Sequence, residues 1–418
     1  MRMKILFVDD TPRVLKAIQH KLLIMRREWH IRVIENGQEA LALLSREPCD
    51  VVIADTRMPV MNGSALLRQV KRDHPEMVRI AMAQPGGRDG ILKRHRSAHQ
   101  FVPKPCDMET LKMAVSRACQ IERLLRTVDL RKMTSSIESL PDAESPYRDL
   151  IEGIRDRTLE AVQVAERLAS DPGMCEKAFL LAKLSAGPQA PLDMEAADAV
   201  EILGLDVVMA LAIFCHTVSL LDTVEMDGFS SEDFWNHSFT VAFFAKWITE
   251  SEIVIPEGES DSEEVALARQ VINDAFIGGL LHDLGKPLMA AFNPKGYARA
   301  LELSASEEMP MEQAELKCMQ ASHAEAGAHL LRYWNLDDSL IDVLFFHHDP
   351  SESRASRFNP PTAVHVANVL VNGFLQGMTG LGSTKIDEVY LEHLDLLLNL
   401  DFWRETCEDS FREKMGYA

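Results

Sequence analysis

The 418-residue sequence lacks the features that mark secreted, disulfide-stabilised or membrane-embedded proteins. Its seven cysteines are scattered and no two form a CxxC pair, which favours reduced thiols in the cytoplasm over a disulfide framework or zinc ribbon. No uninterrupted apolar run approaches the ~18–20 residues of a membrane span. The N-terminal "MRMKILFVDD" reaches acidic residues too early for a signal peptide. We therefore expect a cytoplasmic protein that is not embedded in a membrane.

The chain also lacks the positive charge typical of general nucleic-acid binders, since its net charge is −20. We find no helix-turn-helix with a basic recognition helix and expect no DNA binding. The charge is uneven: residues 1–120 hold 21 Lys and Arg against 13 Asp and Glu, whereas residues 121–418 hold 23 against 51. Much of the positive charge lies in "RDGILKRHR", residues 88–96. Two solvated surfaces would explain this, and so would docking of 88–96 on the acidic remainder or on a partner.

The length predicts two or three domains, and the pattern changes near residue 120. Residues 1–120 alternate short apolar runs with segments of helical spacing. The expected strands are 4–10, 31–35, 49–55, 78–83 and 100–104. Five such βα units predict an α/β doubly wound parallel sheet with helices on both faces and ligands at the carboxyl ends of its strands.

Beyond residue 120 the apolar residues recur at helical spacing nearly throughout, which predicts an all-α region. We expect residues 121–146 to form a linker helix and a junction, because "TSSIESLPDAESPY" (134–147) is polar. Residues 147–400 would then form the main helical domain and 401–418 a C-terminal helical tail.

Acidic residues end two of the N-terminal strands. Asp9 and Asp10 follow the first strand, Asp55 ends the third, and Lys104 ends the fifth. Three converging carboxylates repel one another unless a cation lies among them, and carboxylate oxygens suit Mg²⁺. A metal-bound carboxylate beside a lysine can take up phosphate as an acyl phosphate. The alternative is that these are ordinary polar residues at strand ends.

Residues 1–120 resemble the receiver domain of two-component response regulators, which is flavodoxin-like. The resemblance implies that Asp55, in "DTRMPVMNG", is phosphorylated by a sensor histidine kinase. It also implies that Asp9, Asp10, Asp55 and the Arg57 carbonyl bind Mg²⁺. In "FVPKP", Lys104 would contact the phosphoryl group, the Lys104–Pro105 bond would be cis, and Phe101 would be the switch aromatic.

One position departs from the receiver pattern. Receivers carry Ser or Thr at the end of the fourth strand, where this chain has Ala83 in "RIAMAQ". Residues 65–96 contain no Ser or Thr, so no change of register restores the hydroxyl. Phosphorylation of Asp55 is still expected, but its coupling to Phe101 would be weak or would use a different route.

Nine of the fourteen histidines lie beyond residue 200, several of them inside apolar helical segments. Buried polar groups that lack a partner cost ~1–3 kcal/mol each. A lone histidine is more often a satisfied polar group than a ligand, but a set mixed with carboxylates suits Zn, Fe, Mn or Co.

The region from about 134 to 400 resembles the HDOD module, an all-helical, HD-related output domain of bacterial signalling proteins. The motifs that carry the resemblance occur in family order: "LASDPGMCEKAFLLAKLS" (168–185), "AVEILGLDVVMAL" (199–211), "DFWNHSFTVAFFAKWI", "AFIGGLLHDLGKPL", "HAEAGAHLLRYWNL" and "HHDP". The resemblance implies an HD-superfamily fold in a class of domain of which many members lack the ligands of an enzyme.

Comparison with HD-GYP phosphodiesterases implies a set of metal ligands for Fe, Mn or Zn, in which Asp283 would bridge two ions and Lys286 would complete HD-x-x-K. Asp233 stands where that family has Glu, and Asn368 stands in place of its last acidic ligand. The full set is Asp233, His237, His282, Asp283, His323, His347, His348 and Asn368. No GYP motif follows "HHDP".

Three functions remain open. In the first, phosphorylation of Asp55 changes how a metal-binding helical module contacts an unknown downstream signalling protein, with homodimer formation possible. In the second, the chain is a phosphorylation-gated metal phosphohydrolase for a nucleotide or cyclic dinucleotide, with Lys286 gripping substrate. The missing GYP, Asn368 and the acidic field disfavour it. In the third, the receiver does not respond to phosphate and serves as a constitutive dimerisation unit.

Overall fold

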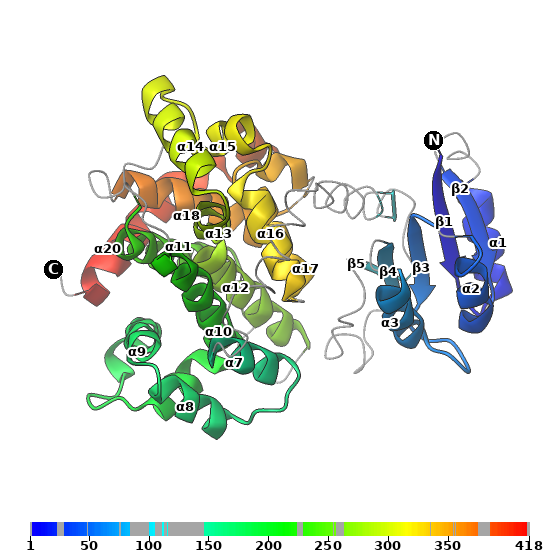
Figure 1. Cartoon of the computed structure of the whole chain (residues 1–418), viewed down its shortest axis with the longest axis horizontal. Coiled ribbons are helices and arrows are strands. Elements are labelled where there is room, and N and C mark those ends of the chain that lie inside the picture. The colour runs from blue at the N-terminus through cyan, green and yellow to red at the C-terminus, as the bar shows by residue number, and fades with distance from the viewer. Residues whose placement is uncertain are drawn as a thin grey trace. The chain divides into compact units, whose positions relative to one another are not determined.

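The computed structural model describes residues 2–22, 29–47, 49–74, 77–83, 100–104, 111–112, 115, 146–223, 229–253, 255, 263–334, 336–353, 355, 357–374 and 385–415. The chain separates into an N-terminal unit and a helical unit (Figure 1). Each is described by itself below, as the N-terminal domain and the helical domain.

The N-terminal domain is built on a five-stranded sheet with the order β2-β1-β3-β4-β5. All four pairs of neighbouring strands are parallel. The carboxyl ends of the strands therefore meet at one edge, where the register sets Asp55 beside Met82. The strands are β1 (Met3–Val8), β2 (Trp29–Ile34), β3 (Val51–Asp55), β4 (Val78–Ala83) and β5 (Gln100–Pro103).

The two faces of the sheet carry separate apolar cores because side chains alternate along each strand. Ile5 and Phe7 of β1 pack with Leu15 of α1 (Pro12–Lys21) on one face. Leu6 and Val8 pack on the other face, against α2 (Gly37–Leu44) and α3 (Gly63–Asp73). Burial on both faces explains why β1 and β3 read as continuous apolar runs.

The helical domain contains fourteen α-helices among the described residues (Figure 1). They are α7 (Pro146–Arg155), α8 (Ala161–Ala169), α9 (Pro172–Ala186), α10 (Ala196–Ser219), α11 (Ser231–Glu252), α12 (Glu263–Leu281), α13 (Gly285–Phe292), α14 (Pro294–Glu307), α15 (Met311–Met319), α16 (His323–Tyr333), α17 (Asp338–Phe346), α18 (Pro360–Phe374), α19 (Glu388–His393) and α20 (Leu400–Met415).

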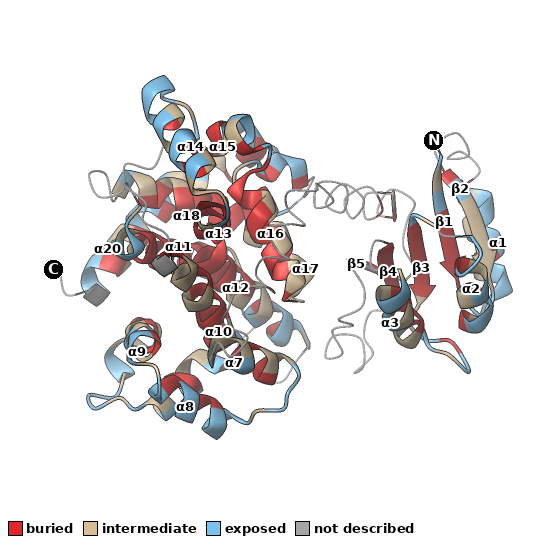
Figure 2. Cartoon of the chain, in the orientation of Figure 1, coloured by how far each residue is buried: buried red, intermediate tan, exposed pale blue. Residues whose placement is uncertain are grey.

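The centre of the helical domain is formed by α11, α12 and α18, which pack against one another, while α13 packs against α16. Figure 2 shows buried residues concentrated in these helices. Gly279 lets α12 approach α11 closely, because a Cβ there would lie 2.7 Å from the Ala242 Cα. The last helix, α20, also packs on α11, where Trp403 donates its Nε1–H to Glu252.

One described helix, α10, is long and apolar enough to cross a membrane by length and composition alone. More than half of its most apolar stretch is buried within the domain, where α10 packs against α7, α8 and α9. Glu201 and Asp206 interrupt the apolar run, so the sequence shows no continuous span. This pattern is that of a core helix and is weak evidence for a membrane segment.

The predicted fold class is confirmed in both regions, although strand ends differ by up to two residues from those expected. Several expectations fall on residues outside the described ones. These are the structure of the basic segment 88–96, of the linker before Pro146, of Pro105 and of the side chain of Phe101.

Candidate metal centres

The first candidate centre lies at the carboxyl edge of the N-terminal sheet. Asp9, Asp10 and Asp55 each offer an oxygen, and these oxygens lie within 4.8 Å of one another. Lys104 Nζ lies 2.5 Å from Asp9 Oδ2 and 2.8 Å from Asp55 Oδ2. One ammonium does not balance three carboxylates, so the donor set fits a hard dication such as Mg²⁺.

Backbone groups orient these carboxylates. The Thr11 N–H donates to Asp9 Oδ1, and the Arg57 N–H donates to Asp55 Oδ1. Asp9 is buried, Asp10 is exposed and Asp55 is partly exposed. The Arg57 carbonyl stays a predicted ligand. Ala83 pairs with Pro103 at the end of β4, so the strand end carries a methyl group where a hydroxyl was expected.

The second candidate centre is assembled at helix ends in the helical domain. His237 lies on α11, His282 and Asp283 directly follow α12, and Lys286 lies in the first turn of α13. His323 opens α16, whose start is fixed by a capping box between Ser322 and Glu325. His347 and His348 directly follow α17.

Close backbone packing brings these helix ends together. A Cβ at Gly285 would lie 1.8 Å from the His323 carbonyl oxygen, so α13 and α16 meet there without an intervening side chain. The glycine of "HDLGK" therefore has a structural reason: a larger residue would push His323 away from Asp283.

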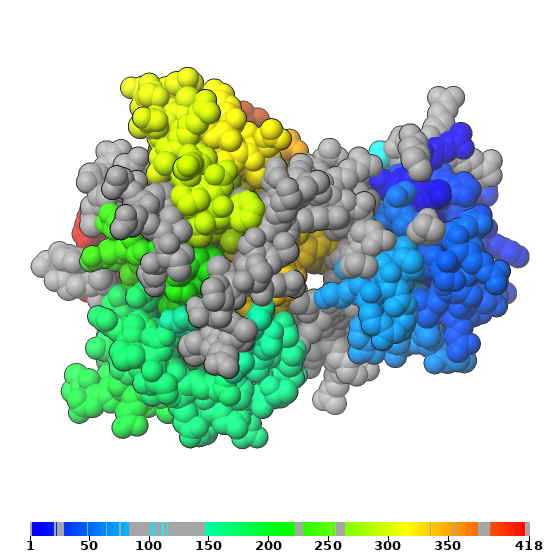
Figure 3. Space-filling model, viewed as in Figure 1, coloured from blue at the N-terminus to red at the C-terminus, as the bar shows by residue number. Residues whose placement is uncertain are grey.

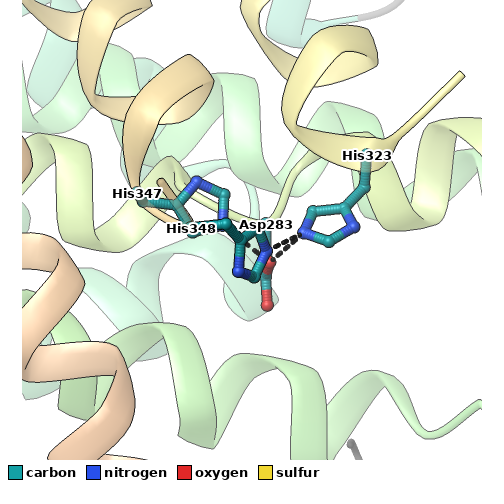
Figure 4. Close-up of side chains that lie close together, drawn as sticks. All are labelled: Asp283, His323, His347 and His348. Carbon is teal, nitrogen blue, oxygen red and sulfur yellow. Dashed lines mark hydrogen bonds and ion pairs between the residues drawn. The ribbon is translucent and has the colours of Figure 1, made fainter. Parts of the chain in front are cut away.

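Asp283 is the shared member of two groups. One group is His237, His282 and Asp283, and the other is Asp283, His323, His347 and His348. Figure 4 shows the second group, in which His323 approaches Asp283 from one helix and the two adjacent histidines approach from another segment. Asp283 Oδ2 lies 3.2 Å from His282 Nε2 and 2.5 Å from Lys286 Nζ. Asp283 Oδ1 lies 3.2 Å from His323 Nε2 and 3.7 Å from His347 Nε2.

Three of the histidines are held through Nδ1, which leaves Nε2 directed at Asp283. His282 Nδ1 lies 2.8 Å from the Gly279 carbonyl oxygen, and His347 Nδ1 lies 2.8 Å from that of Leu344. His323 Nδ1 lies 2.6 Å from Glu315 Oε2. A neutral imidazole that donates through Nδ1 has its lone pair on Nε2, and metal-binding histidines are oriented in this way.

Burial and neighbouring charges shift the pKa values of the cluster. Burial and the neighbouring His282 lower the pKa of His237 to about 3, and burial lowers the pKa values of His347 and His348 well below their usual range. Burial also disfavours charge on His323, but Glu315 and Asp283 outweigh it and raise the pKa of His323 to about 9. Burial opposes ionisation of Asp283, yet His282 and Lys286 hold its pKa well below the usual range. Metal-free protein at neutral pH therefore holds a proton on His323, which a metal ion would displace.

Two predicted ligands stand apart from the rest. Asp233 lies one turn before His237 on α11, but it belongs to neither group of the described residues. An aspartate is one methylene shorter than the glutamate expected there, so its carboxylate extends less far toward the group. Asn368 is buried and uncharged, and its Oδ1 accepts a hydrogen bond from Asn372. The histidine one turn earlier, His365, uses both ring nitrogens on the backbone of His347 and Asp387.

Sequence reasoning missed Glu315. Its side chain is fully buried on α15, and Oε2 accepts hydrogen bonds from both the backbone N–H and Nδ1 of His323. Glu315 lies eight residues before His323, a spacing that no simple ligand motif uses. A buried glutamate among apolar residues of a helix was the available signal, but it could not be distinguished from a surface charge without knowing which face of α15 is covered.

Comparisons with known proteins agree with this architecture. The model of the HDOD domain family matches residues 140–350, and that of the response regulator receiver domain matches residues 5–116. The chain is 36% identical over 107 residues to the DNA-binding transcriptional regulator NtrC of Escherichia coli, covering 25% of this chain and 23% of NtrC. It is 21% identical over 274 residues to an uncharacterised protein of Treponema pallidum, covering 65% of this chain and 50% of that protein. The chain thus spans half or less of the length of these two relatives.

Among solved structures, an HDOD domain protein of unknown function from Geobacter sulfurreducens is 22% identical, with a TM-score of 0.45, and the match covers 71% of this chain and 90% of that one. The family match extends over half of the sequence and includes the segment that holds His282, Asp283, Lys286 and His323. The chain therefore belongs to the HDOD family, and its N-terminal receiver domain makes it a response regulator.

Proposed function

We propose that phosphorylation of Asp55 controls a helical domain that binds a transition metal and acts through a protein partner. The receiver domain implies a phosphodonor such as a histidine kinase. Asp55 lies beside Asp9, Asp10 and Lys104, which is the charge arrangement that a Mg²⁺-assisted acyl phosphate needs. Bound Mg²⁺ would neutralise the phosphoryl oxygens, while Lys104 would give up its contact with Asp55 to hold one of them.

Metal binding in the helical domain rests on one observation. Histidines 282, 323 and 347 are each fixed through Nδ1 by a buried acceptor, so their Nε2 atoms face one ionised carboxylate, Asp283. Without an ion, this arrangement sets the Nε2 lone pairs of His282 and His347 beside a carboxylate in a dry interior, which is costly. His347 Nε2 and Asp283 Oδ1 have no hydrogen-bond partner among the described residues. A divalent ion would satisfy both atoms.

The burial of the centre supports a structural role for the metal. Asp283, His323 and His347 are at most 1% exposed. Residues this deeply buried are poorly placed to contact a phosphodiester, and Lys286 is already engaged with Asp283. The metal would then hold the ends of α12, α13, α16 and α17 in one arrangement, which the partner recognises.

Hydrolysis of a phosphodiester is the second candidate, and the histidine and aspartate set favours it. A metal bound there could lower the pKa of a water molecule and polarise a phosphate oxygen. Lys286 would have to leave Asp283 to bind substrate. The net negative charge of residues 121–418 would repel an anionic substrate unless the local field reversed it.

Metal content tests the proposal directly. Full-length protein purified without a metal-binding tag, in excess Mg²⁺, is measured by plasma mass spectrometry beside His323→Ala and Asp283→Ala variants. We expect near-stoichiometric Fe, Mn or Zn in the wild type and loss in both variants. His393→Ala is the matched control, because that histidine is exposed on α19. Absence of a transition metal, even after incubation with each ion, would reject the metal-binding and hydrolase readings together.

The receiver step is tested separately. Acetyl phosphate should phosphorylate the wild type in the presence of Mg²⁺ but not an Asp55→Asn variant, as seen by gel mobility shift. Metal content of the helical domain should be the same in both. Phosphorylation that persists in Asp55→Asn would show that another residue accepts the phosphoryl group.

A further inference from the structure

The two oxygens of Asp283 are used differently. Oδ2 lies 2.5 Å from Lys286 Nζ and so already has a cation as its partner. Oδ1 has no hydrogen-bond partner among the described residues, although His323 Nε2 is 3.2 Å away. Family resemblance predicts two ions bridged by Asp283, but this asymmetry does not fit two equivalent sites.

On the Oδ2 side, the carboxylate oxygen and the facing His282 and His237 Nε2 atoms have partners without a metal. Lys286 donates to Oδ2. His282 is fixed through Nδ1 on the Gly279 carbonyl, so its Nε2 can accept a hydrogen bond from His237 Nε2, 3.3 Å away. On this side His237 Nδ1 is the buried ring nitrogen that still has no hydrogen-bond partner among the described residues, and it belongs to the ring edge that does not face His282.

On the Oδ1 side, buried polar atoms are left without hydrogen-bond partners in the part of the chain that the structure describes. His347 donates through Nδ1, and its buried Nε2 has no partner among the described residues. His323 Nε2 and His348 Nε2 are 2.7 Å apart, a contact that the proton of His323 bridges in the metal-free protein and that a metal ion would replace. Three imidazole nitrogens and one carboxylate oxygen here lie within 4.8 Å of one another.

Charge favours the same side. Glu315 is ionically paired with His323 and adds a second buried carboxylate behind the Oδ1 group. On the Oδ2 side the expected acids are missing, because Asp233 lies outside the group and Asn368 is uncharged. A dication placed there would also lie close to the Lys286 ammonium, and like charges in a dry interior repel strongly.

We infer that the helical domain binds a single divalent transition-metal ion, held by Asp283 Oδ1, His323, His347 and His348. On the Oδ2 side of Asp283, the ammonium of Lys286 takes the place of a second metal ion. This inference rests on the metal binding proposed above and specifies its number and place. A set of three imidazoles and one carboxylate suits Zn²⁺ or Fe²⁺ and disfavours Mg²⁺.

Stoichiometry in the unmodified protein is the first test, because it needs no substitution. Full-length protein is stripped with a chelator, returned to excess Mg²⁺ to saturate the receiver site, and titrated with Zn²⁺ by calorimetry and by metal analysis after gel filtration. We expect one Zn²⁺ per chain. Two ions per chain would overturn the inference and leave the proposed metal binding intact, whereas none would overturn both.

A matched pair of substitutions locates the ion. His347 and His237 are both buried histidines next to Asp283, but they lie on opposite sides of it. His347→Ala should weaken Zn²⁺ binding at least 100-fold, and His237→Ala should change it by less than threefold. Circular dichroism of the metal-free proteins checks folding, and His347→Gln replaces His347→Ala if the cavity unfolds the domain. Equal losses in the two variants would overturn the assignment.

Lys286→Met tests the role given to the lysine. The substitution removes the ammonium and keeps an unbranched side chain of similar length, so Oδ2, His237 and His282 become available. We expect the Zn²⁺ capacity to rise from one to two, with the second ion bound more weakly. A capacity that stays at one would overturn the part assigned to Lys286.

Discussion

Each domain has a buried aspartate paired with a lysine, but the residue types around the pair differ between the two domains. In each, a lysine contacts a buried aspartate at 2.5 Å: Lys104 with Asp9 in the receiver, and Lys286 with Asp283 in the helical domain. The receiver surrounds its pair with further carboxylates, one of them exposed. The helical domain surrounds its pair with imidazoles, nearly all of them fully buried.

The difference sets how long an ion or phosphate can stay. Carboxylates at a sheet edge open to solvent bind a hard ion that exchanges and can be joined by a phosphoryl group. Imidazoles fixed through Nδ1 in a dry interior select a softer ion and hold it between helix ends. Under the proposed function, one centre would serve a transient signal and the other would hold a lasting structure on which that signal acts.

The largest effect is expected at two glycines that bring backbone against each centre. A Cβ at Gly63 would lie 2.1 Å from the Asp55 carbonyl oxygen, and one at Gly285 would lie 1.8 Å from that of His323. Because each contact is with backbone, alanine at either position should cost its own domain about 4 kcal/mol or more. Gly63→Ala should abolish phosphorylation by acetyl phosphate, and Gly285→Ala should unfold the helical domain.

Tryptophan fluorescence separates the two outcomes. Trp29 lies in the receiver and the other four tryptophans lie beyond residue 230, so a Trp29→Phe background reports on the helical domain alone. Gly373→Ala is the control, since a Cβ there meets nothing within 4 Å and alanine favours a helix. If Gly63→Ala destabilised the helical domain as much as Gly285→Ala does, the two centres could not be treated as independently supported.

A smaller effect is expected at Glu315, which supports a ligand without being one. In Glu315→Gln the single amide oxygen can still accept from both the backbone N–H and Nδ1 of His323, as Oε2 does, but it no longer carries the negative charge that holds His323. Loss of such a supporting carboxylate should weaken Zn²⁺ binding about 10–100-fold, as measured by competition with a chelator.

Glu325→Gln is the matched control for this substitution. Glu325 lies one turn along α16 and completes its capping box, a role that glutamine also fills. Zn²⁺ affinity should therefore stay unchanged in Glu325→Gln. If Glu315→Gln bound Zn²⁺ as tightly as the wild type, the orientation of His323 would not depend on a charged partner.

The sequence predicted the receiver sheet well because both of its faces are covered. Runs such as "VVIAD" have no polar face, and their alternation with helical spacing leaves few other folds. Strand ends were less certain, since Asp9 and Asp10 continue the first run in sequence but lie beyond β1, which ends at Val8. The two acidic residues therefore lie just outside the strand that positions them, whereas Asp55 is the last residue of β3.

The helical centre was predicted less completely. Adjacent pairs such as His282–Asp283 and His347–His348 are visible in sequence because ionisable groups are rare in apolar runs. The asymmetry between Oδ1 and Oδ2 of Asp283 was not, because it depends on which helix end delivers Lys286 and Glu315. Sequence spacing also does not predict how far a side chain extends. Asp233 had the expected spacing from His237 but lies outside the group.

The smallest expected effect concerns Glu312, on α15, whose helix lies with α14 (both yellow) at the surface of the domain (Figure 3). Burial, with Asp349, Glu315 and Glu325 nearby and only His323 opposing, raises the pKa of Glu312 to about 7. The folded state thus binds this proton more tightly than the unfolded chain, where the pKa is near 4.5. The helical domain should lose stability as pH rises from 4.5 through 7, by on the order of 1–2 kcal/mol.

Glu312→Gln removes that ionisation, so it should flatten this part of the stability profile and make the variant more stable than the wild type at pH 8 but not at pH 5. Urea unfolding in the Trp29→Phe background measures both, and the exposed Glu392→Gln is the control, expected to run parallel to the wild type. Parallel profiles for Glu312→Gln would mean that solvent reaches the carboxylate freely. The contrast between a solvent-open receiver centre and a closed helical centre would then be weaker at this edge than burial indicates, and α15 would be the place where the closed centre opens.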